Sequence, residues 1–257
     1  MAEIDNLELL LSEIDLVKTE LQLQSPLQEA KWRQIQATEN TYHSNSLEGS
    51  SLSLRETEMV ISTGLMLPGK PMAENLLALN HYQAVQLIRN QAAEQALLSE
   101  DLLRQAFLTL LKGLNRQQAV GYRTQAAKLT NGQPAPDAAQ LETLMVELCH
   151  WAHLEGPFLH PVIFAAETQL RLQSLKPFPT AHGLYARLAM NLILLEEGYP
   201  LLNLDGSENG RSAYYAALAD AQSSQDHNQW YCFIAKQALH TWQNLLQRLQ
   251  NQEDHIE

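Results

Sequence analysis

The segment from Lys176 to Arg187 holds the residue types of this sequence that are best suited to chemistry. It reads KPFPTAHGLYAR, with two prolines and a glycine ahead of an apolar run that predicts a helix over 184–197. His182 and Gly183 stand at the start of that helix, where backbone N–H groups favour anions. His182 could therefore bind an anion or act as a displaced base, or it could simply cap the helix or face solvent. Lys176 leaves a similar choice between a functional amine and a solvated turn residue.

A longer stretch around this segment resembles the core of the Fic family. Between His160 and Pro200 the chain reads HP, then FAAE, a turn containing PF, and then G, R, L, MN, LIL and GYP. The segments SNSLEG at 44–49 with LSLRETE after it, GYR at 121–123 and YYAAL at 214–218 agree with the same family. The resemblance covers most of the chain from about residue 30 onward. It implies an all-α protein, a Fic-type helical bundle with a short β-hairpin flap.

The resemblance also assigns chemistry to the turn. Active Fic proteins transfer AMP from ATP with a turn that reads H-P-F-x-D/E-G-N-G-R-x-x-R. The histidine takes a proton from the target hydroxyl, the acidic residue holds Mg²⁺, and the asparagine, backbone and first arginine bind phosphate. Here Lys176 replaces the histidine, Thr180 the acid and Leu184 the first arginine, while Ala181 and His182 replace a glycine and the asparagine. The motif is therefore degenerate.

These replacements act against AMP transfer for physical reasons. Lysine has an ordinary pKa of about 10.4, so it is a poor proton acceptor at neutral pH unless burial lowers that value strongly. A neutral threonine hydroxyl offers Mg²⁺ a much weaker ligand than a carboxylate. We therefore assign no catalytic residue, name only Lys176 and His182 as candidates, and expect no metal site. The ligand-binding loop that the resemblance implies comprises Lys176, Phe178, Thr180, His182, Gly183 and Arg187.

A second motif of the family is retained. Ser44, Glu48 and Gly49 match the inhibitory pattern [S/T]-x-x-x-E-[G/N], and Arg187 matches the second arginine of the catalytic turn. In self-inhibited Fic proteins this glutamate pairs with this arginine and blocks productive placement of ATP. Beside a degenerate turn, we expect a pair between Glu48 and Arg187 to tie the N-terminal helix to the core.

Several functions remain open on this evidence. The first is a degenerate Fic-fold protein that has lost AMP transfer and acts by binding, in a regulatory or scaffold role. The alternative is a Fic-fold transferase of altered chemistry that uses Lys176 and His182, or residual protein adenylyltransferase activity restrained by Glu48. A buried Lys176 of lowered pKa in an open pocket would favour altered chemistry, whereas a filled apolar pocket around Leu184 would favour binding. ATP and Mg²⁺ would serve as cofactors only if the altered pocket still binds nucleotide.

The rest of the chain is predicted to position these residues through helices. Apolar residues recur at three- and four-residue spacing through most of the sequence. We predict a helical extension over 1–30, a Fic-like domain over 31–250 and a frayed tail over 251–257. Within the domain we place the inhibitory helix at about 40–62 and the flap at about 121–137, where Gly132, Pro134 and Pro136 interrupt the helical pattern.

The charge and the apolar pattern of the sequence argue against nucleic acid and membranes as partners. With 17 Lys and Arg against 29 Asp and Glu, the net charge of −12 argues against nucleic acid. No basic leader or apolar run of membrane-spanning length occurs, so we expect a cytoplasmic protein without a membrane contact. His150 and His153 lack a third metal ligand, and we interpret them as surface residues. The resemblance adds a protein partner at the flap and a homodimer as expectations.

Four tryptophans are predicted to pack in the interior: Trp32, Trp151, Trp230 and Trp242.

Overall fold

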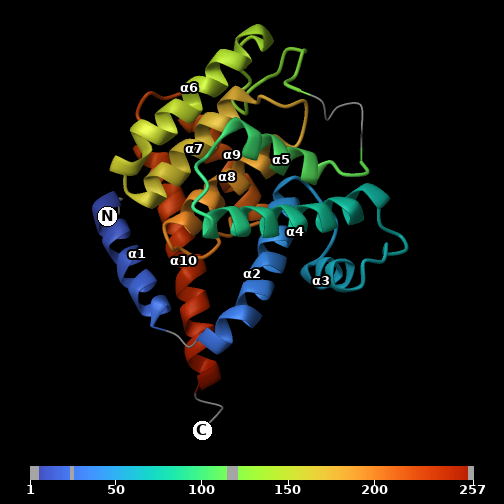
Figure 1. Cartoon of the computed structure of the whole chain (residues 1–257), viewed down its shortest axis with the longest axis vertical. Coiled ribbons are helices and arrows are strands. Elements are labelled where there is room, and N and C mark those ends of the chain that lie inside the picture. The colour runs from blue at the N-terminus through green and yellow to red at the C-terminus, as the bar shows by residue number, and fades with distance from the viewer. Residues whose placement is uncertain (1–5, 24–25, 115–120, 254–257) are drawn as a thin grey trace.

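The computed structural model describes residues 6–23, 26–114 and 121–253, and this part of the chain is built from helices. The fold is all-α, as predicted, and Figure 1 shows the helices gathered around a central pair, α7 and α8. In chain order the helices are α1 (Leu7–Gln22), α2 (Pro26–Leu47), α3 (Leu54–Thr63), α4 (Met72–Ala93), α5 (Glu100–Leu110), α6 (Leu141–Leu154), α7 (Pro161–Leu175), α8 (His182–Glu196), α9 (Glu208–Ala221) and α10 (Asn228–Glu253), with short 3-10 turns at Ala138–Gln140 and Gly156–Phe158.

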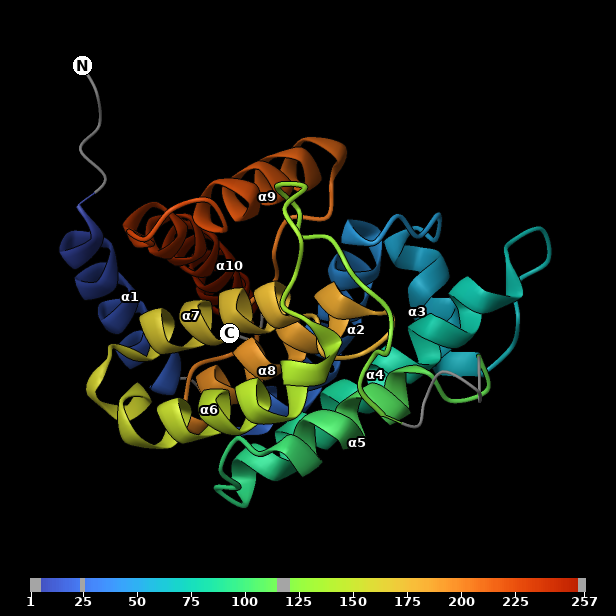
Figure 2. The same ribbon diagram turned by 90° about the horizontal axis from the view of Figure 1, so that it is seen from above.

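Helix α8 is the centre of the molecule. Every residue from Gly183 to Leu194 is buried, which fits a helix that is apolar on most of its surface and enclosed by its neighbours. It packs against α7 and α4, and Figure 2 shows it beside α7. Because its first turn carries the candidate residues, the whole core fixes where the site lies.

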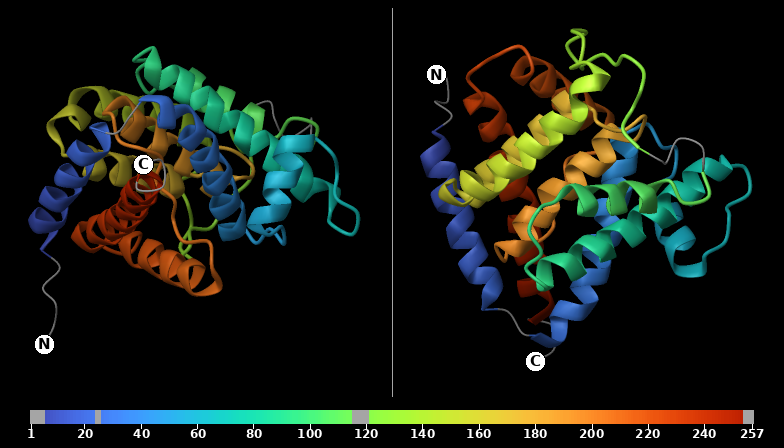
Figure 3. Two further views of the ribbon diagram at one scale, coloured as in Figure 1. Left: turned by 90° about the horizontal axis from the view of Figure 1, so that it is seen from below. Right: turned by 45° about the horizontal axis from the view of Figure 1, so that its top comes forward.

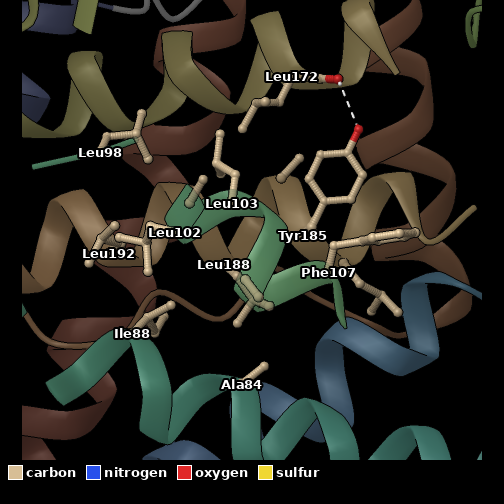
Figure 4. Close-up of a cluster of buried hydrophobic side chains, with 14 of the residues drawn as sticks. Ala84, Ile88, Leu98, Leu102, Leu103, Phe107, Leu172, Tyr185, Leu188 and Leu192 are labelled. Atoms are coloured by element: carbon tan, nitrogen blue, oxygen red, sulfur yellow. Dashed lines mark hydrogen bonds between the residues drawn. The ribbon is translucent and has the colours of Figure 1, made fainter. Parts of the chain in front are cut away.

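Two clusters of apolar side chains surround α8. One joins α4, α5, α6 and α8, and Figure 4 shows Phe107 and Tyr185 in it, with the Tyr185 hydroxyl donating to the carbonyl of Leu172 at 3.5 Å. The other joins α1, α7, α9 and α10 around Trp230 and Trp242. All four tryptophans are buried, which confirms the prediction for them.

The predicted flap is present as a minimal hairpin. Lys128 and Pro134 form an isolated antiparallel bridge. The N–H of Leu129 donates to the carbonyl of Gln133 at 2.8 Å, and the N–H of Ala135 donates to that of Ala127 at 2.9 Å. Prolines within the segment limit the number of ladder hydrogen bonds, so the hairpin stays short.

The N-terminal region differs from the predicted spans in two places. The predicted inhibitory helix over about 40–62 is two helices, because α2 ends at Leu47 and α3 begins at Leu54. Gly49 adopts a left-handed φ of 91° between them, and Ser53 caps α3 in a capping box with Glu56. The residue types at Gly49 and Ser53 are those that end one helix and begin the next. Similarly, α2 crosses the boundary predicted at residue 30 without a break.

The C-terminal end is more helical than predicted. Helix α10 continues through Glu253, so the first three residues of the predicted frayed tail belong to it, and 254–257 lie outside the described residues. Within the part of the chain that the structure describes, no helix is both long and apolar enough to span a membrane.

Candidate functional site

The turn between α7 and α8, residues 176–181, is held by backbone and ring contacts. Lys176 ends α7 in a left-handed conformation with φ of 46°, and its N–H donates to the carbonyl of Leu172 at 2.9 Å. Phe178 is buried and stacks on Phe107 with ring centroids 4.2 Å apart. Ala181, also left-handed with φ of 57°, precedes the first turn of α8. The α7–α8 turn, as we call it, is thus anchored by its aromatic residue.

Arg187 and Glu48 form the ion pair that the inhibitory motif predicts. The Nη2 atom of Arg187 lies 2.8 Å from Oε1 of Glu48. The same guanidinium donates from Nε to Oγ of Ser44 at 2.8 Å and from Nη2 to its carbonyl at 2.9 Å. Arg187 is only 3% exposed, and although burial disfavours its charge, Glu48 raises the pKa of the guanidinium. A buried charge is kept because it has a partner.

Gly183 brings this pair onto the first turn of α8. A Cβ atom at Gly183 would lie 2.0 Å from Oε1 of Glu48 and 2.6 Å from Nη1 of Arg187, so only glycine leaves room for them. The carboxylate of Glu48 therefore rests beside a helix N-terminus, where the dipole and free N–H groups favour a negative charge. We call Ser44, Glu48, Gly183 and Arg187 the Glu48–Arg187 junction.

The end of α2, directly before Glu48, is fastened by contacts that the sequence did not reveal. The N–H of Gly206 donates to Nδ1 of His43 at 3.1 Å, and the Tyr215 hydroxyl donates to the carbonyl of Leu47 at 3.2 Å. Nδ2 of Asn40 donates to the carbonyl of Leu202 at 2.9 Å. The two residues of each of these bonds are more than 160 positions apart in the sequence. Among them, only Tyr215 belongs to a segment that the family resemblance singled out, YYAAL at 214–218.

Lys176 and His182 lie within electrostatic reach of each other. Burial lowers the pKa of Lys176, Glu48 opposes this and Arg123 adds to it. Burial also lowers the pKa of His182 to about 4, with a further contribution from the Lys176 ammonium. Nδ1 of His182 is buried and has no hydrogen-bond partner among the described residues. The structure therefore brings both candidates to one place and keeps the imidazole neutral at pH 7.

Lys176 is already engaged by the flap. Its Nζ atom donates to the carbonyl of Lys128 at 2.5 Å. From the other side, Nε of Arg123 donates to the carbonyl of Lys176 at 2.9 Å, while its remaining nitrogens donate to carbonyls that include those of Gln125 and Pro136. The flap is thus tied to the α7–α8 turn at its base.

The tip of the flap is fastened to the far end of α9. The N–H of Thr130 donates to Oε1 of Gln222 at 2.8 Å, and Nδ2 of Asn131 donates to Oγ of Ser223 at 3.0 Å. Together with the bonds at its base, these contacts hold the hairpin over the α7–α8 turn.

The residues present do not fit a Mg²⁺ ion bound between phosphates. No acidic residue occurs from Lys176 to Arg187, and Thr180 is the residue at the position of the acid. Among the described residues, no group of three or more His, Cys, Asp or Glu could hold a metal ion. Glu48, whose carboxylate lies beside the first turn of α8, is paired with Arg187. Leu184, in place of a phosphate-binding arginine, is 2% exposed and belongs to the core.

Solved structures share this helical architecture. The chain is similar to Fic-1 from Caenorhabditis elegans (residues 134–508), with a TM-score of 0.79 and 21% identity over 96% of this chain and 73% of that one. It is also similar to a Fic domain containing signalling protein from Bacteroides thetaiotaomicron, with a TM-score of 0.81 and 19% identity over 94% of this chain and 97% of that one. These matches show the fold.

Sequence comparisons point to the same family. No family model matches the chain. It is 28% identical over 202 residues to a protein adenylyltransferase Fic of Nematostella vectensis, covering 77% of this chain and 46% of that protein. It is 25% identical over 218 residues to the protein adenylyltransferase fic-1 of Caenorhabditis elegans, covering 84% and 42%. The chain thus spans less than half the length of these relatives. The sequence matches and the shared fold show that the chain is similar to Fic proteins.

Proposed function

We propose that this protein does not transfer AMP and acts by binding, in a regulatory or scaffold role on the Fic fold. One observation carries the proposal. The carboxylate of Glu48 lies against the first turn of α8 at Gly183, held by Arg187 at 2.8 Å. An anion of the chain itself thus takes the position where a helix N-terminus would otherwise favour phosphate.

The α7–α8 turn supports the same conclusion through what replaces the expected groups. The Nζ atom of Lys176 donates to the carbonyl of Lys128, and a charged lysine is a poor base. His182, with a pKa of about 4, is too weak a base to draw a proton from a hydroxyl efficiently near pH 7. Leu184 is buried in the core, and its side chain has neither a charge nor a hydrogen-bond donor for a phosphate.

An altered transferase is the second candidate. The lowered pKa values of Lys176 and His182 and their proximity favour it, because functional sites gather such shifts. Against it stand the buried Leu184 and the bond from Lys176 to the flap, which engages the lysine ammonium. The names of the relatives add a third candidate, adenylyl transfer restrained by Glu48.

Calorimetric titration with ATP and Mg²⁺ separates these candidates when it is run on the parent protein and on Glu48→Gly. The matched control is Glu155→Gly, which removes an exposed acid from another turn. We expect no binding by any of the three proteins at millimolar nucleotide. Intact mass measured after incubation with ATP reports any AMP attached to the chain.

The other outcomes are equally specific. AMP attached to the Glu48→Gly protein would contradict the proposal and establish transfer restrained by Glu48. Nucleotide binding by Glu48→Gly without transfer, lost again in Glu48→Gly combined with Lys176→Met, would favour the altered transferase.

A further inference from the structure

Helix α1 carries apolar residues on two opposite faces, and only one of them is packed. Figure 1 and Figure 3 show α1 at the edge of the molecule, with α10 on one side of it. The inner face belongs to the core cluster shared with α10 and comprises Leu7, Leu10, Leu11, Ile14, Val17 and Leu21. On the outer face, Leu9, Leu16 and Leu23 are 57%, 65% and 81% exposed.

The outer leucines form a line. Their spacing of seven residues is close to two helical turns, so the three side chains follow one another over about 21 Å along the helix. A single exposed leucine needs no explanation, but three in register opposite the buried face have the pattern of a coiled-coil seam. Ser12 and Thr19 occupy the intervening seam positions.

The polar seam residues can be covered without cost. The hydroxyl of Ser12 donates to the carbonyl of Glu8 at 2.9 Å, and that of Thr19 donates to the carbonyl of Asp15 at 2.8 Å. A partner helix would therefore bury no unsatisfied donor at these positions. Because both residues are small, they also leave hollows between the leucines for larger apolar side chains of a partner.

The charges beside the seam select the partner. Glu8 and Asp15 flank it on one side and Glu13 on the other, and no exposed residue of α1 in the described range is basic. Asp15 is partly engaged, because its Oδ1 atom accepts from the Tyr199 hydroxyl and lies 3.3 Å from Nε2 of His160. Glu8 and Glu13 are therefore the acids with no such contact in the described range. Lys18 is half-buried, with its Nζ atom 4.1 Å from the centre of the Tyr199 ring. A second copy of α1 would place acids against acids in either orientation, whereas lysine or arginine at the flanking positions would be attracted.

We propose that the outer face of α1, defined by Leu9, Ser12, Leu16, Thr19 and Leu23, binds an amphipathic helix of another protein whose apolar seam is flanked by basic residues. Two heptads form a small contact, which suits a reversible partner better than a permanent one. The proposal concerns a surface separate from the α7–α8 turn and holds whether or not that turn binds nucleotide.

Two labelled synthetic peptides of 21 residues test this, both with leucine at the seam positions. One carries lysine at the flanking positions and the other glutamate. Fluorescence anisotropy with the full chain should show binding of the lysine peptide, weakened by salt, and none of the glutamate peptide. The triple variant Leu9→Gln, Leu16→Gln, Leu23→Gln keeps every charge and should lose at least about tenfold in affinity, or 1.4 kcal/mol.

The control variant is Leu97→Gln, which removes a leucine that is 68% exposed elsewhere and should bind like the parent. Circular dichroism checks that the triple variant is folded. Equal binding of the lysine peptide by parent and triple variant would overturn the proposal, because charge alone would explain it. Failure of the lysine peptide to bind, or a chain dimer that the triple variant dissolves, would overturn it as well.

Discussion

The Glu48–Arg187 junction and the α7–α8 turn lie at the same end of α8 but are built differently. At the junction, a buried guanidinium is bonded to Glu48 and twice to Ser44. In the turn, Lys176 and Ala181 hold left-handed conformations without being glycine, and directly after it a buried nitrogen of His182 has no hydrogen-bond partner among the described residues. Each region leaves one buried nitrogen without a hydrogen-bond partner among the described residues, Nη1 of Arg187 at the junction and Nδ1 of His182 beside the turn, but only the junction contains a buried ion pair.

This difference shows which contacts depend on chemistry and which on packing. Removing either member of a buried ion pair leaves the other charge uncompensated. The fold therefore loses stability when Glu48 or Arg187 is replaced, whether or not the α7–α8 turn has an activity. Phe178 anchors the turn in the core against Phe107, whereas the Lys176 ammonium bonds only to the flap, so replacing Lys176 should cost the fold less than replacing Arg187. If the protein has lost AMP transfer, as we propose, the Glu48–Arg187 pair is retained for its contribution to stability.

The largest expected effect comes from breaking the junction. Arg187→Met leaves the Glu48 carboxylate and Ser44 without their donor, and we expect the free energy of unfolding to fall by about 3–5 kcal/mol. Urea denaturation followed by circular dichroism measures it. Arg211→Met removes an exposed arginine beside Gly49 and should change stability by less than about 0.5 kcal/mol. A loss below about 1 kcal/mol for Arg187→Met would show that the junction is dispensable.

Acid should weaken both regions through one histidine each. Burial lowers the pKa of His182 to about 4 on the turn side, and burial together with Arg187 lowers that of His81 to about 3 on the junction side. The unfolded chain binds these protons at about pH 6.5, so stability is complete above that pH and falls as the pH drops toward the folded values.

We expect His182 to account for about 2 kcal/mol of that loss, allowing for its partial exposure. Between pH 6.5 and 4, His182→Gln should therefore lose less stability than the parent. His81→Gln should flatten the profile further toward pH 3. Parallel pH profiles for parent and His182→Gln would contradict a neutral, buried imidazole in the turn.

The sequence predicted the helices well because apolar periodicity is a local signal. It placed α8, whose buried residues are nearly continuous, and the flap, whose prolines and glycine interrupt the helical pattern. The segment predicted as the inhibitory helix, about 40–62, contains a break, which Gly49 and Ser53 mark in the sequence.

The candidate site was predictable only in part. The partnership of Glu48 with Arg187 followed from the family resemblance, since the pair is separated by 139 residues and no local pattern links it. The bond from Lys176 to the flap and the clamp on α2 by Gly206 depend on where distant backbone carbonyls and amides arrive. Such contacts have no sequence signature, because any residue supplies a backbone group.

A smaller effect is expected where junction and turn meet, at Gly183. In Gly183→Ala the new methyl group collides with the Glu48 carboxylate, and moving that side chain off Arg187 should cost about 1–2 kcal/mol. In a Glu48→Gly background the same substitution should cost about 1 kcal/mol less, a coupling that urea denaturation of the four proteins measures.

Gly121→Ala is the control for this cycle, since nothing lies within 4 Å of the added atom. Equal costs of Gly183→Ala in both backgrounds would mean that Glu48 does not occupy the first turn of α8 in solution.

The smallest effect should come from the turn itself. Ala181 has φ of 57°, where a Cβ atom costs about 1 kcal/mol that glycine avoids, although glycine loses about 0.5–1 kcal/mol in chain entropy. Ala181→Gly should therefore raise thermal stability slightly or leave it unchanged. Lys176→Gly gains the same relief but loses the bond to Lys128, so it should lower stability. If Ala181→Gly instead cost more than about 1 kcal/mol, the Ala181 methyl group would contribute to packing and the turn would be as closely specified as the junction.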